Sequence, residues 1–216
     1  MTKQELWSDD HWLFLLQLYL RKPMGVKPLY SRPMVALSLE LHISPQVLYG
    51  RMFRLRQLDT PRLEYLWKQY AERPKKLARE VKLLRQMHGF GQADAFYDGV
   101  EMSESFERDF KPLEEDSQLM PMMLIIILDL YFRLIPITMV PETPEVIRLS
   151  KLMRIAPQKI TQVMEVFRFC DPYLNRDDIM ITPLLAPCQD IWQRYGNANP
   201  EQLAALAAQL KEYFDN

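Results

Sequence analysis

Glycine, cysteine and histidine are scarce in this sequence of 216 residues, which contains 6 Gly, 2 Cys and 3 His. Scarce glycine beside 13 Met argues against a turn-rich β fold and favours helices. Cys170 and Cys188 are too few for a disulfide framework and lack metal-ligand spacing, which favours a reducing compartment. We therefore expect an all-α protein without disulfides.

Long apolar runs are also missing. The longest, Met122 to Leu128, ends at Asp129 and is too short to span a bilayer, so it predicts a buried helix. The N-terminal segment carries Asp9 and Asp10 where a signal peptide needs a basic flank. We expect a cytoplasmic protein with no membrane partner.

The residue sets of common enzymes are not found in the sequence. His11, His42 and His88 are scattered, no Ser/His/Asp or Cys/His set is placed by spacing, and no glycine-rich phosphate loop occurs. Asp129 and Arg133, one helical turn apart, predict a structural ion pair on one helix. We expect a protein that is not an enzyme, with no catalytic residue, no cofactor and no metal.

An internal repeat is the strongest pattern in the sequence. The stretch from Leu37 to Asp59 recurs in the second half of the chain, from Leu149 to Asp171. The residues shared between the two stretches include Ile43, Pro45, Gln46, Met52 and Arg56 in the first and Ile155, Pro157, Gln158, Met164 and Arg168 in the second. Matches at a constant offset indicate a duplication. We predict two tandem helical modules, each containing a helix-turn-helix-like unit.

Charge is distributed unevenly along the chain, whose net charge is −1. Residues 1–88 carry a net charge of +8, residues 89–117 of −7 and residues 118–216 of −2. We divide the chain into a basic helical module with the helix-turn-helix (1–89), an acidic connector (90–117) and a second, diverged copy of the module (118–216). The connector contains aromatic residues by which it could dock, namely Phe96, Tyr97, Phe106 and Phe110.

The helices of the first module are predicted from their periodicity and caps. The first has the core stripe Trp12, Leu15, Leu16, Tyr19 and Leu20. A second begins near Pro33, a turn lies at residues 42–44, and a third begins with Ser44 as cap and Pro45 in its first turn. Helix, tight turn and helix form the helix-turn-helix arrangement.

The third helix has an apolar face and a polar face. Leu48, Met52 and Leu55 fall within one sector and are expected to face the core. Away from that sector lie side chains that donate hydrogen bonds to phosphates and base edges or pack on bases. The candidate nucleic-acid-binding residues of this helix are Gln46, Tyr49, Arg51, Arg54, Arg56 and Gln57. Gly50 costs a helix interior roughly 1 kcal/mol relative to alanine, which suggests that a neighbouring helix or a ligand approaches it closely.

The pattern Ser44-Pro45-x-Val47-x-x-x-Arg51-x-x-x-Leu55-x-x-Leu58-Asp59 resembles the small helical DNA-binding segment at the front of some bacterial HNH-type restriction endonucleases. The resemblance extends from the start of the chain to the neighbourhood of Asp59. It implies DNA contact by the third helix. It implies no cleavage, because the His-Asn-His nuclease site does not follow.

Lys75, Arg79 and Lys82 form a basic stripe on the last helix of the first module. They are candidates for phosphate contacts, and a solvated helix face is the structural alternative. In the second copy Glu165 would face phosphate unfavourably, so this copy is not expected to bind DNA in the same way. Its expected role is to form a homodimer or to hold a protein partner.

Two functions are therefore open. The first is a transcription-regulator-like protein that contacts double-stranded DNA through the first module. The alternative is a helical protein–protein interaction or scaffold protein without nucleic acid, in which the basic face meets an acidic partner or the chain's own connector. The charge pattern also allows autoinhibition, in which acidic residues from Glu101 to Asp116 compete with phosphate for the arginines.

Overall fold

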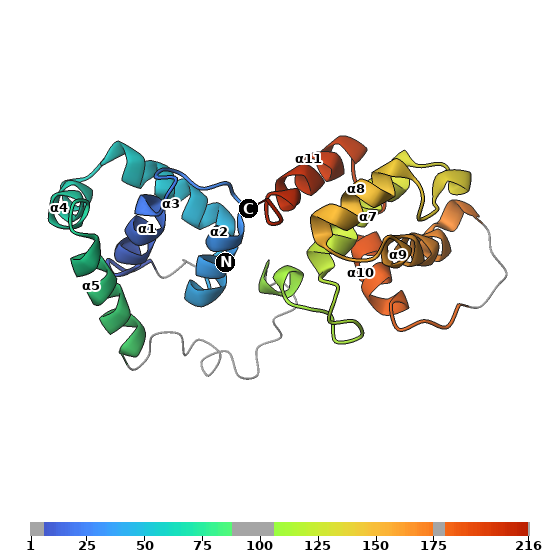
Figure 1. The fold of residues 1–216 in the computed structure, drawn as a ribbon, viewed down its shortest axis with the longest axis horizontal. Coiled ribbons are helices and arrows are strands. Elements are labelled where there is room, and N and C mark those ends of the chain that lie inside the picture. The colour runs from blue at the N-terminus through green and yellow to red at the C-terminus, as the bar shows by residue number, and fades with distance from the viewer. Residues whose placement is uncertain (1–6, 88–105, 175–179, 216) are drawn as a thin grey trace. The chain divides into compact units, whose positions relative to one another are not determined.

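The computed structural model describes residues 7–87, 106–174 and 180–215 (Figure 1). These residues form α-helices and short 3-10 helices and no β-strand, so the predicted all-α fold is confirmed. The chain divides into two compact units, Met1–Ser105 and Phe106–Asn216, which we call unit 1 and unit 2. The division falls inside the predicted connector 90–117, of which residues 90–105 lie outside the described part of the chain.

Unit 1 is organised around its first helix. The helices of this unit are α1 (His11–Leu20), α2 (Arg32–Leu41), α3 (Pro45–Gln57), α4 (Pro61–Tyr70) and α5 (Pro74–Gln86). Helix α1 packs against α2, α3 and α5, and Figure 1 shows it between α3 and α5. Its residues Trp12, Phe14, Leu15, Leu16, Leu18 and Tyr19 are buried.

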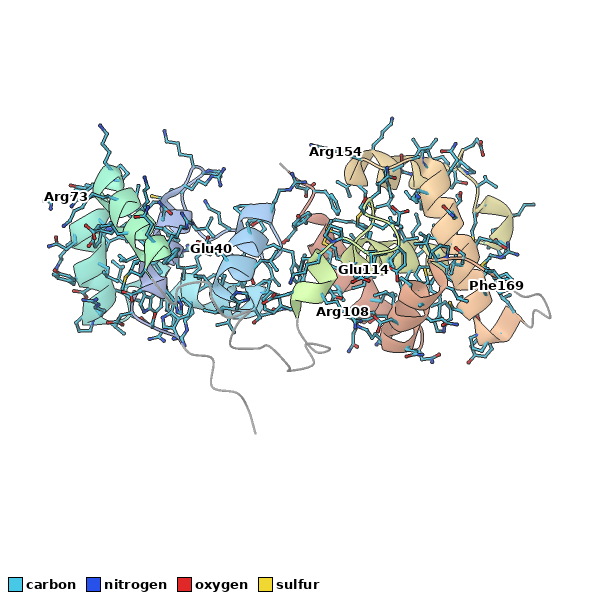
Figure 2. All side chains as sticks on the ribbon, turned by 90° about the horizontal axis from the view of Figure 1, so that it is seen from below. Glu40, Arg73, Arg108, Glu114, Arg154 and Phe169 are labelled. Carbon is cyan, nitrogen blue, oxygen red and sulfur yellow. The ribbon has the colours of Figure 1, made fainter. Side chains whose placement is uncertain are left out.

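Helices α3 and α5 pack on different sides of α1. The guanidinium carbon of Arg51 on α3 lies 6.0 Å from the ring centre of Trp12, and that of Arg85 on α5 lies 5.4 Å from the ring centre of Phe14. Because residues two positions apart point to nearly opposite sides of a helix, α3 and α5 flank α1 on opposite sides. Arg85 also donates to Glu40 of α2, which is labelled in Figure 2, at 2.9 Å from Nη2 to Oε2, and so ties α5 to α2.

Unit 2 is organised around a helix that is buried along most of its length. Its elements are η1 (Phe106–Phe110), α7 (Pro121–Arg133), η2 (Pro136–Thr138), α8 (Pro144–Met153), α9 (Pro157–Cys170), η3 (Pro172–Leu174), α10 (Leu185–Tyr195) and α11 (Pro200–Lys211). Every residue of α7 from Pro121 to Tyr131 is buried, and α9, α10 and α11 pack against it. The prediction that Met122 to Leu128 form a buried helix is therefore confirmed.

A buried carboxylate on α7 has two basic neighbours. Asp129 is 5% exposed and accepts from Nη2 of Arg133 at 2.7 Å. Nζ of Lys211 on α11 lies 3.9 Å from the same carboxylate. The predicted ion pair on α7 is therefore present, and Lys211 extends it to a second helix.

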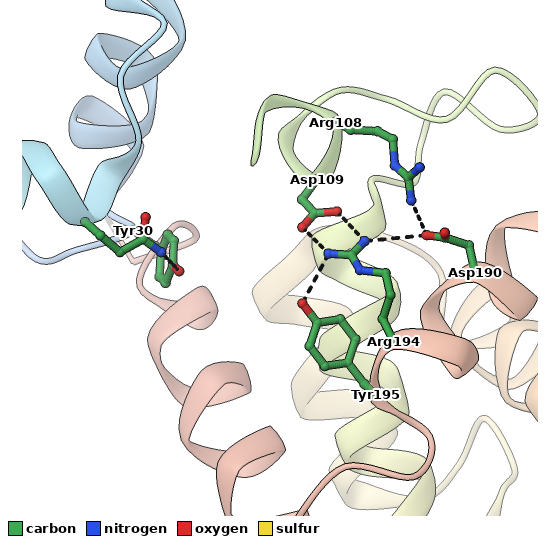
Figure 3. Close-up of polar contacts among 7 residues, drawn as sticks. Tyr30, Arg108, Asp109, Asp190, Arg194 and Tyr195 are labelled. Carbon is green, nitrogen blue, oxygen red and sulfur yellow. Dashed lines mark hydrogen bonds and ion pairs between the residues drawn. The ribbon is translucent and has the colours of Figure 1, made fainter. Parts of the chain in front are cut away.

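The described end of the connector belongs to unit 2 and is held there by ion pairs (Figure 3). Arg194 of α10 donates to both carboxylate oxygens of Asp109, at 2.8 and 2.6 Å, and Arg108 pairs with Asp190. Phe110 is buried, with its ring centre 6.2 Å from that of Tyr213. The docking of this connector aromatic is therefore observed, and the carboxylate of Asp109 is engaged inside unit 2.

None of the helices described here is both long enough and apolar enough to cross a membrane. The two cysteines are unpaired, and burial raises the pKa of the Cys170 thiol to about 11 and that of the Cys188 thiol to about 12. Both are therefore protonated at neutral pH, which disfavours reaction as thiolates.

Replacing Gly196 by alanine should destabilise unit 2. A Cβ at this position would lie 2.7 Å from Cε2, Nε1 and the backbone carbonyl oxygen of Trp192, whose ring packs against Tyr131 and Phe167. We expect a loss of about 1–3 kcal/mol in the free energy of unfolding, typical of overpacking. Urea unfolding followed by circular dichroism measures this loss. An unchanged stability would show that Trp192 moves aside without loss of packing.

Candidate nucleic-acid interface

Helices α2 and α3 are joined by the short segment from His42 to Ser44. His42 ends α2 in the left-handed conformation, with φ of 54°, and the backbone N–H of Ile43 donates to the carbonyl of Ser38 at 3.1 Å. Ser44 occupies the N-cap position of α3 and Pro45 its first turn, as the sequence predicts, but the Ser44 side chain makes no capping hydrogen bond. The short turn places α3 against α2 and fixes the position of the N-terminus of α3.

The inner face of α3 anchors it in unit 1. Leu48, Met52 and Leu55 are each fully buried, as their common sector on the helix predicts. They belong to one apolar cluster with residues of α1, α2, α4 and α5. The position of α3 is therefore set by the apolar packing of its inner face.

The outer face of α3 is a line of exposed residues. Gln46, Gly50, Phe53 and Gln57 recur at spacings of four, three and four along the helix, and all four are exposed. Tyr49 lies beside them and packs edge-on against Phe53, with ring centres 5.0 Å apart. Gln46 donates from Nε2 to the hydroxyl of Tyr30 at 2.7 Å, which fixes one end of the line.

Gly50 lies in the middle of this line and has open space above it. An added Cβ would meet no heavy atom within 4 Å. Of the two expectations for Gly50, a closely packed neighbouring helix is therefore not found among the described residues. Close approach of a ligand to the helix backbone remains.

The three arginines of α3 have different surroundings. The guanidinium carbon of Arg51 lies 5.1 Å from the ring centre of Trp7, so this side chain is engaged by a cation–π contact within unit 1. Arg54 donates from Nε to Oδ2 of Asp59 at 2.6 Å. Arg56 is exposed on the flank of the outer face.

Lys75, Arg79 and Lys82 form an exposed stripe on α5, opposite its buried residues Leu77 and Val81. Because α3 and α5 flank opposite sides of α1, this stripe and the outer face of α3 are two separate surfaces. Of the predicted site residues, Gln46, Tyr49, Arg54 and Gln57 lie on or beside the outer face of α3, and Arg56 lies on its flank. The structure places Arg51 against tryptophan and the α5 residues elsewhere.

Helix α9 of unit 2, which corresponds to α3 in the internal repeat, is more deeply embedded. Val163 and Val166, which stand where α3 has Arg51 and Arg54, are both buried. The charged side chains of α9 are paired: Lys159 with Asp116, and Arg168 with Glu165. This helix therefore offers less free basic surface than α3.

Asp59 makes a contact that the sequence alone did not reveal. It lies on the same sector as the buried leucines and five positions after Arg54, a spacing that does not bring side chains together on a continuous helix. The two meet because α3 ends at Leu58 in the left-handed conformation, with φ of 51°. Leucine rarely adopts this conformation, so no residue type signals the turn.

Among the described residues, no group of three or more His, Cys, Asp or Glu side chains could hold a metal ion. Comparison with protein-family models, with curated proteins and with solved structures found no match. A functional assignment must therefore come from the chemistry of the surface itself.

Replacing Gly50 by alanine should stabilise unit 1, and it tests whether a ligand such as DNA approaches the helix backbone at this position. An alanine meets no neighbour here, so helix propensity alone raises the free energy of unfolding by about 0.5–1 kcal/mol. If a ligand approaches the backbone at Gly50, the added methyl group should reduce affinity at least about threefold, roughly 0.7 kcal/mol. Thermal unfolding and DNA titration of the same preparation measure both. A variant with raised stability and unchanged affinity would contradict close approach.

Proposed function

We propose that the protein binds double-stranded DNA through the outer face of α3 in unit 1, as a transcription-regulator-like protein does. The observation that carries the proposal is the combination of half-buried Arg54 and exposed Arg56 and Gln57 with the open surface above Gly50. Arginine and glutamine have the donors that match phosphates and base edges. The net charge of +8 over residues 1–88 attracts the DNA backbone.

The proposal treats α2 and α3 as a helix-turn-helix, with α3 as the recognition helix. In such a pair the second helix enters the major groove while the first lies across the backbone. The short turn after the left-handed His42 and the apolar anchoring of α3 are consistent with that role. The resemblance of the chain up to Asp59 to the DNA-binding segment of HNH-type endonucleases points to the same helix.

We also infer that unit 2 is a diverged copy of unit 1 that does not bind DNA in the same way. Supporting features recur at the constant offset of the repeat: Arg32 and Pro144 begin α2 and α8, and Pro45 and Pro157 begin α3 and α9. The left-handed residues His42 and Arg154 end α2 and α8. Loss of free basic groups on α9 fits a copy that has taken a packing or assembly role.

Fluorescence anisotropy of the purified chain with a labelled mixed-sequence duplex tests the proposal. For each phosphate contact, raising the salt concentration from about 50 to about 200 mM should lower affinity roughly 3.5-fold, because bound counterions are released. Duplex RNA of the same length is the matched control, since its deep, narrow major groove does not admit a helix. Absence of binding to DNA even at the lower salt concentration would refute the proposal.

A second candidate function is protein–protein interaction through unit 2. Exposed apolar side chains gather between α7 and α8, where Phe132 and Val140 are each 42% exposed and Ile135 and Ile137 still more so. Contiguous exposed apolar residues commonly mark interaction surfaces. If no DNA binding is found, light scattering of the native chain and of an Ile135→Ser/Ile137→Ser variant would test this alternative through a change in assembly state.

A further inference from the structure

The guanidinium group of Arg54 is bound through its Nε. Its Nε donates to Oδ2 of Asp59 at 2.6 Å, and the side chains of the pair are 42% and 31% exposed. Within the described part of the chain no other hydrogen bond or ion pair of Arg54 is found. Because the guanidinium group has donors at Nε, Nη1 and Nη2, a contact at Nε leaves the two terminal nitrogens free as a fork.

The turn after α3 produces this arrangement. Leu58 ends the helix in the left-handed conformation, and Asp59 follows it directly. This reversal brings the carboxylate back to the last turn of α3, where Arg54 lies. Without it, a residue five positions after Arg54 would point away from that side chain.

The terminal nitrogens of Arg54 belong to a side chain that lies near the open surface at Gly50. Gly50 precedes Arg54 by four positions, so the two lie one turn apart on the same side of α3. The lack of a Cβ at Gly50 allows a DNA groove to approach the helix backbone. An arginine beside such a point reaches base edges inside the groove, whereas an arginine kept further out reaches phosphates at its rim.

We propose that Asp59 is a positioning residue for Arg54, and that Arg54 recognises a guanine through O6 and N7 in the major groove. The proposal rests on the proposed function of α3. Guanine presents two acceptors that match the fork of terminal nitrogens, and Asp59 removes the freedom of that fork to turn away. The contact should therefore give sequence preference in addition to affinity.

Unit 2 lacks the pair. At the corresponding positions of the repeat stand Val166, which is 1% exposed, and Asp171, whose carboxylate accepts from the hydroxyl of Tyr131 at 2.9 Å. The aspartate is thus present in both units, but among the residues that the structure describes it has an arginine partner only in unit 1. This difference agrees with a role of the pair in the unit that we assign to DNA.

Electrostatics and positioning predict different results for the loss of Asp59. A carboxylate near DNA repels phosphate, so its removal alone should tighten binding to every duplex. If Asp59 positions Arg54, its removal should also abolish preference for guanine. A weak surface ion pair that only adds stability would leave that preference unchanged.

The experiment begins with selection of preferred duplexes from a randomised pool by the full-length wild-type chain, which identifies a guanine on which affinity depends. Anisotropy titrations then compare that duplex with one in which the guanine pair is replaced. The variants are Asp59→Ala, Asp59→Asn, Arg54→Ala and, as the matched loss of one negative charge, Glu64→Ala. Glu64 lies on α4 and contacts Lys68, at 4.0 Å, and not Arg54.

We expect wild type and Glu64→Ala to prefer the guanine duplex by about tenfold or more. Asp59→Ala and Arg54→Ala should lose most of this preference, and Asp59→Asn, whose side-chain oxygen can still accept from Nε, should keep part of it. Circular dichroism should be the same for all variants.

Equal preference in Asp59→Ala and Glu64→Ala would overturn the positioning role. Uniform weakening of all duplexes by Arg54→Ala would assign Arg54 to phosphate and overturn the guanine contact. Absence of DNA binding by wild type would refute the function itself.

Discussion

Replacing Phe167 by alanine should lower the free energy of unfolding of unit 2 by about 3–5 kcal/mol, the usual cost of removing a buried aromatic ring. Phe167 is fully buried, and its ring centre lies 6.1 Å from that of Tyr131 and 6.2 Å from that of Trp192. Unit 1 has an apolar cluster of its own, so we expect its stability and its DNA binding to be unchanged. Hydrogen exchange followed by mass spectrometry measures the stability of the two units separately in one sample.

Leu55→Ala is the matched control for this variant. Leu55 occupies the position of the repeat that corresponds to Phe167, is also fully buried, and holds α3 in the core of unit 1. Its loss should destabilise unit 1 by about 2–5 kcal/mol and remove DNA binding as α3 loses its support. If Phe167→Ala removed DNA binding while unit 1 stayed protected from exchange, unit 2 would be part of the binding surface.

Apolar periodicity predicted the parts of the fold that depend on one buried face. Helix α3 has a single inner face, and Leu48, Met52 and Leu55 on it are all buried, as predicted. The run from Met122 to Leu128 is apolar on all sides, which predicts burial in every direction, and α7 is surrounded by other helices of unit 2. In both helices the pattern of apolar residues along the sequence is enough to predict which side chains are buried.

Helix α1 shows where periodicity is incomplete. The predicted stripe included Trp12, Leu15 and Tyr19, which are buried, but it omitted Phe14 and Leu18. These two are buried because α1 lies between other helices and must present apolar side chains on more than one side. The number of helices around a given helix is a tertiary property that a single stripe does not specify.

The surroundings of the charged residues were less predictable. Composition showed an acidic connector and a basic module, but two of the connector's acidic side chains, Asp109 and Asp116, pair with Arg194 and Lys159 of unit 2. Autoinhibition, if it occurs, therefore cannot use these two carboxylates without breaking those pairs. Composition gives the number of charged groups in each segment, whereas the fold determines which of them form ion pairs.

The surface that contacts DNA can be identified by comparing two sets of basic residues. Arg54→Ala/Arg56→Ala should lower affinity for a preferred duplex about 10- to 100-fold, because the variant loses the proposed guanine contact of Arg54 and a second positive charge on the same helix. Both side chains lie outside the apolar core, so the fold should be retained. Anisotropy titration at several salt concentrations measures the loss and the change in salt dependence.

The control is the triple variant Lys75→Ala/Arg79→Ala/Lys82→Ala, which removes more positive charge from the same unit. These side chains lie on α5, across α1 from α3, and a duplex seated on the outer face of α3 does not reach them without strong bending. We therefore expect affinity to change by less than about threefold at near-physiological salt, since the only term lost is a long-range attraction that salt largely screens. A reduction of the salt slope by about three would instead assign all three residues to phosphate contacts. That outcome would place the α5 stripe within the interface and require DNA that wraps around unit 1.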